Sequence, residues 1–226
     1  MDPMHLEIIL LLGALLLPGL AHLYIMRTYS KYKKQDAHKT KTGYDIAREI
    51  LDKNNLKDIY IVETPQRLSD HYDPQRKTIR LSREVYHGSS VAALAIAAHE
   101  VGHAMQDKEG HTFMRIRSFI FPVVRLGTQF AYIVVFLGII MGALELFRIG
   151  IGLMALGLIF QLITLPVEFD ASKKAKVELE KVNISDNKTQ NGVSAMLRSA
   201  ALTYVAGVLA SAMGIIRLIL IMNRRR

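Results

Sequence analysis

The chain has 226 residues, of which 50% are hydrophobic and 22% charged, and its formal net charge at pH 7 is +9. This apolar share excludes an ordinary soluble domain, and the absence of cysteine excludes disulfides and thiolate metal ligands. The basic excess does not predict nucleic-acid binding, because most of the lysines and arginines lie beside apolar runs.

Four apolar runs approach or exceed the roughly 18–20 residues that cross a bilayer as a helix. They cover residues 4–26, 126–147, 149–167 and 200–222. The first run has no basic segment before it and no small-residue cleavage site after it, which predicts a retained anchor. Cations follow the first and third runs and precede the second, so the positive-inside tendency predicts a multi-pass protein with residues 27–117 and 168–199 in the cytoplasm.

The last apolar run departs from this orientation. Arg217 interrupts it, and the basic tail Arg224–Arg226 falls on the outer side. A re-entrant or interfacial last segment would also fit these charges. Small residues recur in the same run at four-residue spacing, at Ala206, Ala210 and Gly214. This spacing favours close helix packing.

Between the first and second apolar runs, the sequence predicts a small α+β domain. Thr42 is suited to cap a helix over 43–53, whose apolar residues share one face. Residues 58–63 and 77–82 have the pattern of short strands that could pair, and residues 68–74 carry turn formers. The edge of such a sheet would offer backbone hydrogen bonds to an extended peptide.

An alanine-rich run over 92–106 predicts the next helix. Ser89 or Ser90 is suited to cap its N-terminus, and Lys108 and Gly110 mark its end.

This predicted helix contains His99, Glu100 and His103 in the order His-Glu-x-x-His. Residues four apart share one helix face, so both imidazoles can reach a single Zn²⁺. Glu100 lies about 100° around the helix from His99, where a general base can take a proton from a water activated by the metal. Two solvent-facing histidines are the alternative, but the preceding residues are almost wholly apolar, and buried imidazoles need partners.

A zinc peptidase site needs a third protein ligand. Two predicted spans separate His103 from Glu168 and return the chain to the same membrane face, which makes Glu168 the candidate. Asp170 would point about 200° away on a regular helix, so it could not bind the same metal. Glu109 and His111 do not fit the metzincin spacing. The alternative role for Glu168 is a carboxylate favoured by the dipole of a helix N-terminus.

Three motifs together carry a resemblance to a known family: Asp70-His-Tyr-Asp-Pro74, Ala97-Ala-His-Glu-Val-Gly-His-Ala104 and Pro166-Val-Glu-Phe-Asp-Ala171. Over nearly its whole length, the chain resembles the YugP-like family of bacterial membrane-bound neutral zinc metallopeptidases. The resemblance implies a peptidase of the bacterial plasma membrane with its site on the cytoplasmic side, but it supplies no substrate.

A more distant resemblance is to the HtpX and CAAX prenyl-protease group of gluzincins, whose glutamate ligand is followed four residues later by an aspartate. In this chain Ser172 occupies that fourth position. The orienting role of that aspartate therefore does not transfer to Asp170.

The sequence thus predicts a mainly α membrane protein with four transmembrane helices and a small α+β zincin-like cytoplasmic domain inserted between the first and second. The predicted parts are an anchor (1–26), the metalloprotease domain (27–117), a transmembrane hairpin (118–167), a cytoplasmic helix with the third ligand (168–199) and a C-terminal span with its basic tail (200–226).

The predicted function is that of a zinc metalloendopeptidase acting on membrane-associated or unfolded polypeptides. His99, His103 and Glu168 would bind Zn²⁺, and Glu100 would be the general base. The expected partners are a peptide or protein substrate and the lipid bilayer, with no nucleic acid, and the oligomeric state stays open.

Two alternative functions fit the sequence less well. A catalytically silent membrane scaffold or regulator could retain the zinc site, although such a protein would usually lose the general base. Intramembrane proteolysis of the site-2 type is not expected, because the chain has no Asp-Gly. His71, Tyr72 and His87 are candidates for stabilising the oxyanion, with turn or core roles as their alternative.

Overall fold

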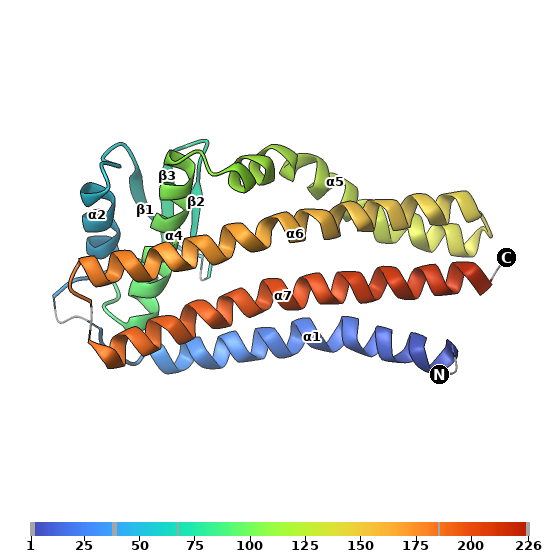
Figure 1. Ribbon diagram of the computed structural model, residues 1–226, viewed down its shortest axis with the longest axis horizontal. Coiled ribbons are helices and arrows are strands. Elements are labelled where there is room, and N and C mark those ends of the chain that lie inside the picture. Colours follow the sequence, from blue (N-terminus) through green and yellow to red (C-terminus); the bar gives the residue numbers. More distant parts are fainter. Residues whose placement is uncertain (1–2, 38–39, 67, 185, 225–226) are drawn as a thin grey trace. The chain divides into compact units, whose positions relative to one another are not determined.

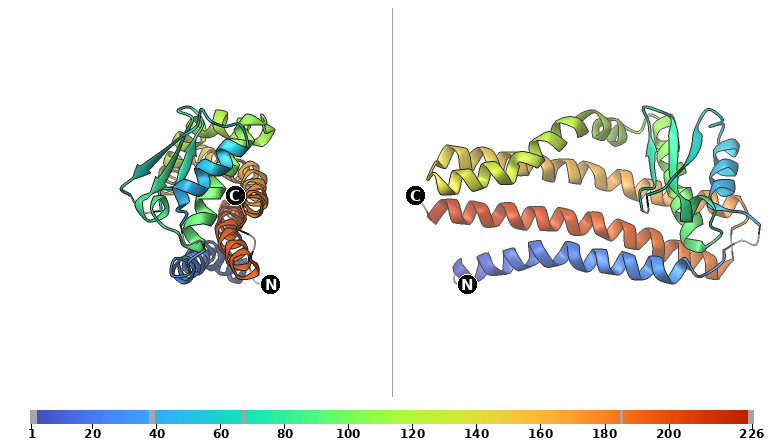
Figure 2. Two further views of the ribbon diagram at one scale, coloured as in Figure 1. Left: turned by 90° about the vertical axis from the view of Figure 1, so that its left-hand side faces the viewer. Right: turned by 180° about the vertical axis from the view of Figure 1, so that it is seen from behind.

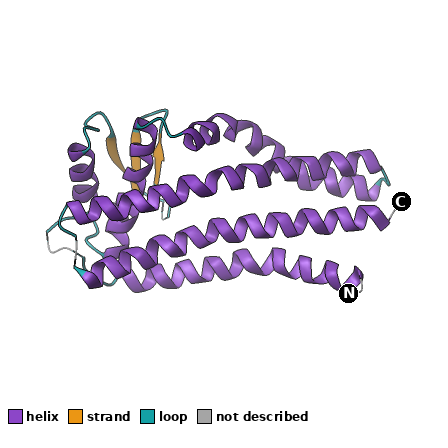
Figure 3. Cartoon of the chain, in the orientation of Figure 1, coloured by secondary structure: helices purple, strands orange, loops and turns teal. Residues whose placement is uncertain are grey.

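The computed structural model describes residues 3–37, 40–66, 68–184 and 186–224. Met1, Asp2 and two arginines of the predicted basic tail, Arg225 and Arg226, lie outside these ranges. The described chain is mainly helical with one small sheet (Figures 1 and 3). Its elements are α1 (Pro3–Tyr32), α2 (Gly43–Lys53), β1 (Tyr60–Thr64), β2 (His71–Asp73), β3 (Thr78–Ser82), α3 (Arg83–Tyr86), α4 (Val91–Lys108), α5 (Thr112–Ile140), α6 (Leu144–Lys181) and α7 (Asn187–Arg224).

The chain divides into two compact units. The bundle unit comprises residues up to Leu23, Arg115–Leu165 and residues from Leu202 onward. The sheet unit comprises Tyr24–Met114 and Pro166–Ala201. The helices α1, α5, α6 and α7 contribute residues to both units, and the short elements between α1 and α5 belong to the sheet unit.

Four helices are long and apolar enough to cross a membrane: Met4–Tyr32, Thr112–Ile140, Leu144–Lys181 and Asn187–Arg224. The prediction of four candidate spans is therefore confirmed. The predicted boundary between the second and third spans at residue 148 is wrong, because α5 ends at Ile140 and α6 begins at Leu144. Gly142 adopts a φ of +63° in the intervening turn. Apolar residues flank this turn on both sides, so hydropathy does not reveal it.

The sheet has the strand order β1-β3-β2. The two predicted strands are present and pair in parallel, with Tyr60 opposite Thr78. The segment 68–74, which carries turn formers, also contains a strand that the sequence did not predict, because β2 lies there and pairs antiparallel to β3, with Tyr72 opposite Ile79. Both views in Figure 2 show α2 and α4 on the same side of the sheet.

Aspartates fix β2 at both ends and account for much of the Asp70-His-Tyr-Asp-Pro74 motif. The Asp70 carboxylate accepts hydrogen bonds from the Ser82 backbone N–H at 2.7 Å and from its hydroxyl at 3.1 Å. Beyond the strand, the Asp73 carboxylate accepts the backbone N–H groups of Gln75 and Arg76. A strand of three residues is thus stabilised mainly by side-chain bonds at its termini.

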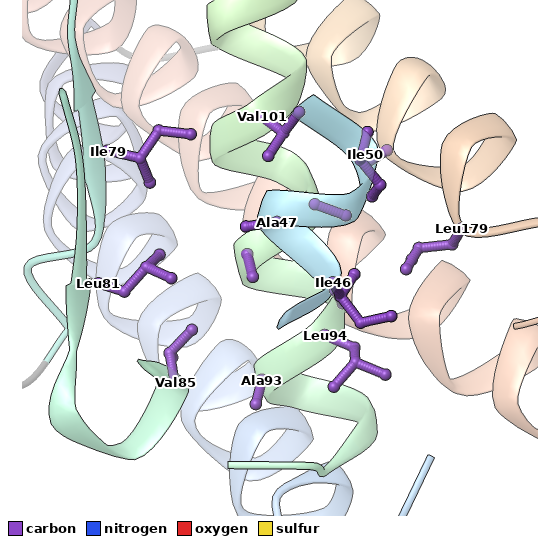
Figure 4. Close-up of a cluster of buried hydrophobic side chains, with 14 of the residues drawn as sticks. Ile46, Ala47, Ile50, Ile79, Leu81, Val85, Ala93, Leu94, Val101 and Leu179 are labelled. Carbon is purple, nitrogen blue, oxygen red and sulfur yellow. The ribbon is translucent and has the colours of Figure 1, made fainter. Parts of the chain in front are cut away.

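The core of the sheet unit is formed by aliphatic side chains from α2, β3, α4 and α6 (Figure 4). Its largest fully buried members include Ile46, Ile50, Ile79, Leu94 and Leu179. The predicted cap of α2 is present, because Thr42 and Asp45 form a reciprocal capping box. Ser90 caps α4 by accepting the backbone N–H of Ala93. Neighbours on several sides of α4 explain why this helix is apolar around most of its circumference.

Gly102 allows α4 to approach α6 closely within the sheet unit. A Cβ atom at Gly102 would lie 2.6 Å from the backbone oxygen of Ala171 and 3.1 Å from its Cα. Any side chain there would collide with backbone, which cannot move aside as a flexible side chain could. The backbones of the two helices therefore touch one residue before His103 and three residues after Glu168.

We predict that Gly102→Ala lowers the melting temperature of the purified protein, with a loss of stability of about 1–3 kcal/mol from overpacking. Gly152→Ala is the matched control, because a Cβ at Gly152 meets nothing within 4 Å. That control should be neutral or slightly stabilising, since alanine favours helix more than glycine does. Equal melting temperatures for Gly102→Ala and the wild type would contradict the role of the close crossing.

Candidate metal centre

Three potential metal ligands converge where α4 crosses α6. His99 and His103 come from α4 and Glu168 from α6, and one ligand atom from each lies within 4.8 Å of the others. The Glu168 Oε2 atom is 3.2 Å from His99 Nε2 and 3.6 Å from His103 Nε2. The structure therefore brings together the three residues that the sequence singled out, and their binding of zinc stays a prediction.

The spacing of these atoms fits a zinc ion. Tetrahedral Zn²⁺ with bonds of about 2.0–2.1 Å places its ligand atoms about 3.3 Å apart. The distances from Glu168 Oε2 to the Nε2 atoms of His99 and His103, 3.2 and 3.6 Å, bracket this value. The side chains of His103 and Glu168 are only 9% and 3% exposed, so the polar atoms face one another in a largely dry site. Two imidazoles and a carboxylate are also a common ligand set of catalytic zinc.

The side chain of Gln106 orients the His103 ring. The Gln106 side chain is fully buried, and its Oε1 lies 3.0 Å from His103 Nδ1. Its Nε2 donates to the Val167 carbonyl and to the Asp170 carboxylate, each at 2.8 Å. Because the amide nitrogen faces these two acceptors, the amide oxygen must accept the Nδ1 proton of His103. The Nε2 lone pair of His103 is therefore directed at the candidate site.

A second contact orients the His99 ring. The Ser172 hydroxyl lies 3.3 Å from His99 Nδ1. Ser172 follows Glu168 by four residues on α6, so both side chains face α4 from the same side of their helix. In both histidines, the Nδ1 atom, which faces away from the site, therefore has a polar partner. This is the usual arrangement around a bound metal.

Sequence reasoning did not assign roles to Gln106 and Ser172. The spacing offered a signal, because Gln106 lies one turn after His103 and Ser172 one turn after Glu168. Asp170 does not contact an imidazole directly and reaches His103 only through the Gln106 amide. Its position two residues after Glu168 is consistent with a regular helix, on which the two carboxylates point apart.

Glu100 lies beside the three potential ligands and is 7% exposed. Burial raises the pKa of the Glu100 carboxyl from its ordinary value of 4.5 to about 7. The neighbouring His99 lowers this pKa, while the negative charges of Glu168 and Asp70 raise it further. A carboxylate with a pKa near 7 can both accept and return a proton at neutral pH, as a general base must.

The other sequence candidates have different surroundings. The Tyr72 hydroxyl donates to the Asp107 carboxylate at 2.9 Å, and burial raises the pKa of this phenol above its usual value. The exposed His71 ring lies 2.6 Å from the Ser69 carbonyl, and the His87 ring lies 2.9 Å from Glu63. Glu109, a discounted ligand, forms an ion pair with Lys174 at 2.7 Å.

Comparisons with known proteins identify the family of the chain. Residues 7–223 match the family described as "Putative neutral zinc metallopeptidase". The chain belongs to this family, because the match covers nearly its whole length. It is also 41% identical over 214 residues to "Putative membrane protease YugP" of Bacillus subtilis (strain 168), which covers 95% of each chain. No solved structure matches significantly. The resemblance stated from the sequence motifs is thereby confirmed.

We predict that Glu100 makes the stability of the metal-free protein depend on pH. The folded pKa of about 7 lies above the ordinary 4.5, so the folded state holds the proton more tightly. This stabilisation is complete below pH 4.5 and is lost as the pH rises through 7. At pH 8 and in the presence of a chelator, Glu100→Gln should therefore have a higher melting temperature than the wild type. The corresponding gain in the free energy of unfolding is at most about 3 kcal/mol. A difference that does not grow between pH 5 and 8 would contradict this assignment.

We also predict that Gln106→Leu lowers zinc affinity about 10–100-fold, as expected for the loss of a partner that orients a metal ligand. Zinc affinity is measured by competition with a chromogenic chelator. Gln106→Glu is the informative second variant, because it keeps an acceptor for His103 but loses the donors to Val167 and Asp170. Wild-type affinity in both variants, with unchanged melting, would show that Gln106 does not orient His103.

Proposed function

We propose that the chain is a membrane-bound zinc metalloendopeptidase of the gluzincin type. His99, His103 and Glu168 would bind the metal, and Glu100 would be the general base. The observation that carries this proposal is the convergence of two imidazoles and a carboxylate, whose ligand atoms lie within 4.8 Å of one another beside a buried glutamate. Membership in a zinc metallopeptidase family supports it independently.

The proposed reaction is the hydrolysis of a peptide bond. When bound, zinc supplies a Lewis acid that makes water more acidic and polarises the peptide carbonyl. The Glu100 carboxylate accepts one proton from water, and the remaining hydroxide adds to the carbonyl carbon. Glu100 then returns the proton to the amide nitrogen as the C–N bond breaks, which gives a carboxylic acid and an amine. Burial suits Glu100 to this exchange, because its pKa lies near neutrality.

The sheet offers a way to position an extended peptide beside Glu100. The strand order leaves β2 at one edge, and the Tyr72 side chain connects this strand to Asp107 on α4. The Tyr72 backbone also lies close enough to Glu100 to lower its pKa slightly. Backbone pairing with an edge strand recognises a peptide without requiring a particular side chain. Such pairing would suit unfolded or membrane-associated polypeptides as substrates.

We further propose that the sheet unit lies on the cytoplasmic side of a bacterial plasma membrane. In this arrangement residues 27–117 form the zincin-like domain inserted after the anchor 1–26, and residues 168–199 supply the third ligand. The cations that flank the apolar runs support this orientation. Only three residues separate α4 from the candidate span α5, which suits a substrate at the membrane surface. A catalytically silent scaffold is not favoured, because Glu100 is present in a metallopeptidase family member.

The proposal predicts different effects for two substitutions in purified, detergent-solubilised protein. Glu100→Gln should retain zinc but lose at least about 100-fold in cleavage of an unfolded casein substrate, because it removes the base. Glu168→Gln should lose both zinc and activity, because an amide is a weaker zinc ligand than a carboxylate. Zinc content is measured by atomic emission and cleavage by the release of fluorescent peptides.

Glu109→Gln serves as the control, since Glu109 is also close to the histidines in sequence but pairs with Lys174. It should keep both zinc and activity. Cleavage by Glu100→Gln at the wild-type rate would overturn the proposed role of Glu100. Full zinc content in Glu168→Gln would overturn the proposed ligand set.

A further inference from the structure

A cavity of about 440 Å³ lies among the helices of the bundle unit. It is lined by α1, α5, α6 and α7 and is mainly apolar. Figure 1 shows α1 and α7 as neighbours in this unit, and the ion pair between Glu7 and Arg224 shows that they run antiparallel. The cavity extends along α7 from Gly207 to Leu218, a length of about 16 Å at the helical rise. Its volume falls within the usual range of ligand sites.

The small residues of α7 leave this space open. The sequence favoured close packing at Ala206, Ala210 and Gly214, but Ala210 and Gly214 line the cavity. A Cβ at Gly207 would meet its nearest neighbour at 3.7 Å and one at Gly214 at 3.9 Å, which are ordinary contact distances. By contrast, a Cβ at Gly13 would lie 2.5 Å from Met213 Sδ, so α1 and α7 do pack tightly beside the cavity.

Arg217 places a positive charge at one end of the cavity. Its Nε atom is buried without a hydrogen-bond partner, and the structure gives Arg217 no ion pair among the residues it describes. Two arginines of the bundle unit differ, because Arg224 pairs with Glu7 and Arg148 with Glu145. An arginine within a candidate span is costly unless an anion or water accompanies it. The Arg217 side chain is therefore suited to bind an anionic group from outside the described chain.

The depth of Arg217 fits a lipid phosphate. Arg217 precedes Arg224 by seven residues, or about 10 Å along α7, and its long side chain can extend toward the membrane interface. The apolar remainder of the cavity continues from there toward Gly207. Two polar side chains in this remainder bind one another, because the Ser211 hydroxyl donates to Gln161 Oε1 at 3.1 Å.

The cavity is long and narrow, which favours a thin occupant over a transmembrane helix about 10 Å wide. A single acyl chain is much thinner. The exposed Leu15 and Tyr132 both line the cavity and are 65% and 71% exposed, so the space opens laterally to the surface that faces lipid in a membrane.

We propose that this cavity binds one anionic phospholipid, with its phosphate at Arg217 and one acyl chain along α7 toward Gly207. Basic pockets between membrane helices bind anionic headgroups in this way. The site lies in the bundle unit and includes none of the potential metal ligands. Lipid binding is therefore independent of the proposed peptidase activity.

The test measures lipid retention by the purified full-length protein in native mass spectrometry, with phosphatidylglycerol and phosphatidylcholine as the two probes. The wild type should retain one phosphatidylglycerol in preference to phosphatidylcholine. Arg217→Met should lower the affinity for phosphatidylglycerol about tenfold, as expected for one charge-assisted contact. Arg148→Met is the matched control, because it removes an arginine that pairs with Glu145 and does not line the cavity.

A second pair of variants tests the acyl-chain part of the site. Gly214→Leu should fill the cavity and reduce phosphatidylglycerol retention while Arg217 stays in place. Gly19→Leu is its control, because a side chain there meets nothing within 4 Å and does not line the cavity. Melting temperatures verify that all variants are folded. The proposal is overturned by equal retention of both lipids in the wild type, by unchanged retention in Arg217→Met and Gly214→Leu, or by a photocrosslinker at Tyr132 that labels a protein and not lipid.

Discussion

The candidate metal centre depends on the close crossing of α4 and α6 at Gly102 and Ala171. Two imidazoles on one helix do not complete a zinc site, because a third ligand atom must come from another element. Backbone contact between the two helices places Glu168 between the histidine rings, at 3.2 and 3.6 Å from their Nε2 atoms.

The same crossing also supplies the groups that orient the ligands. Gln106 on α4 reaches across to Val167 and Asp170, and Ser172 on α6 reaches back to His99. Both helices therefore supply a side chain that orients a histidine of α4. The fully buried glutamine is tolerated because three hydrogen bonds offset the desolvation of its amide.

The sequence predicted those features that depend on local spacing. The caps at Thr42 and Ser90, the strands within 58–63 and 77–82, and the four apolar helices follow from periodicity and from residue preferences that act within a few positions. The strand β2 was not predicted, because its bonds to Ser82 and its contact with α4 join segments distant in the chain. The turn at Gly142 was misplaced for a different reason, since hydropathy is uniform across it.

The three potential metal ligands also differ in how far apart in the chain the evidence for them lies. His99 and His103 were predicted from their spacing on one helix, whereas Glu168 was predicted because two spans return the chain to the same side of the membrane. The three atoms meet as that argument required, and zinc binding by them stays a prediction. The relay from Asp170 through Gln106 to His103 could not be inferred, because it depends on the rotation of α6 relative to α4. Each unit also contains charged groups withdrawn from water: Glu100 and Glu168 are buried in the sheet unit, and in the bundle unit the Nε atom of the half-buried Arg217 has no hydrogen-bond partner. Because burying a charge costs free energy unless an opposite charge accompanies it, a cation suits the two acids and an anion suits the arginine.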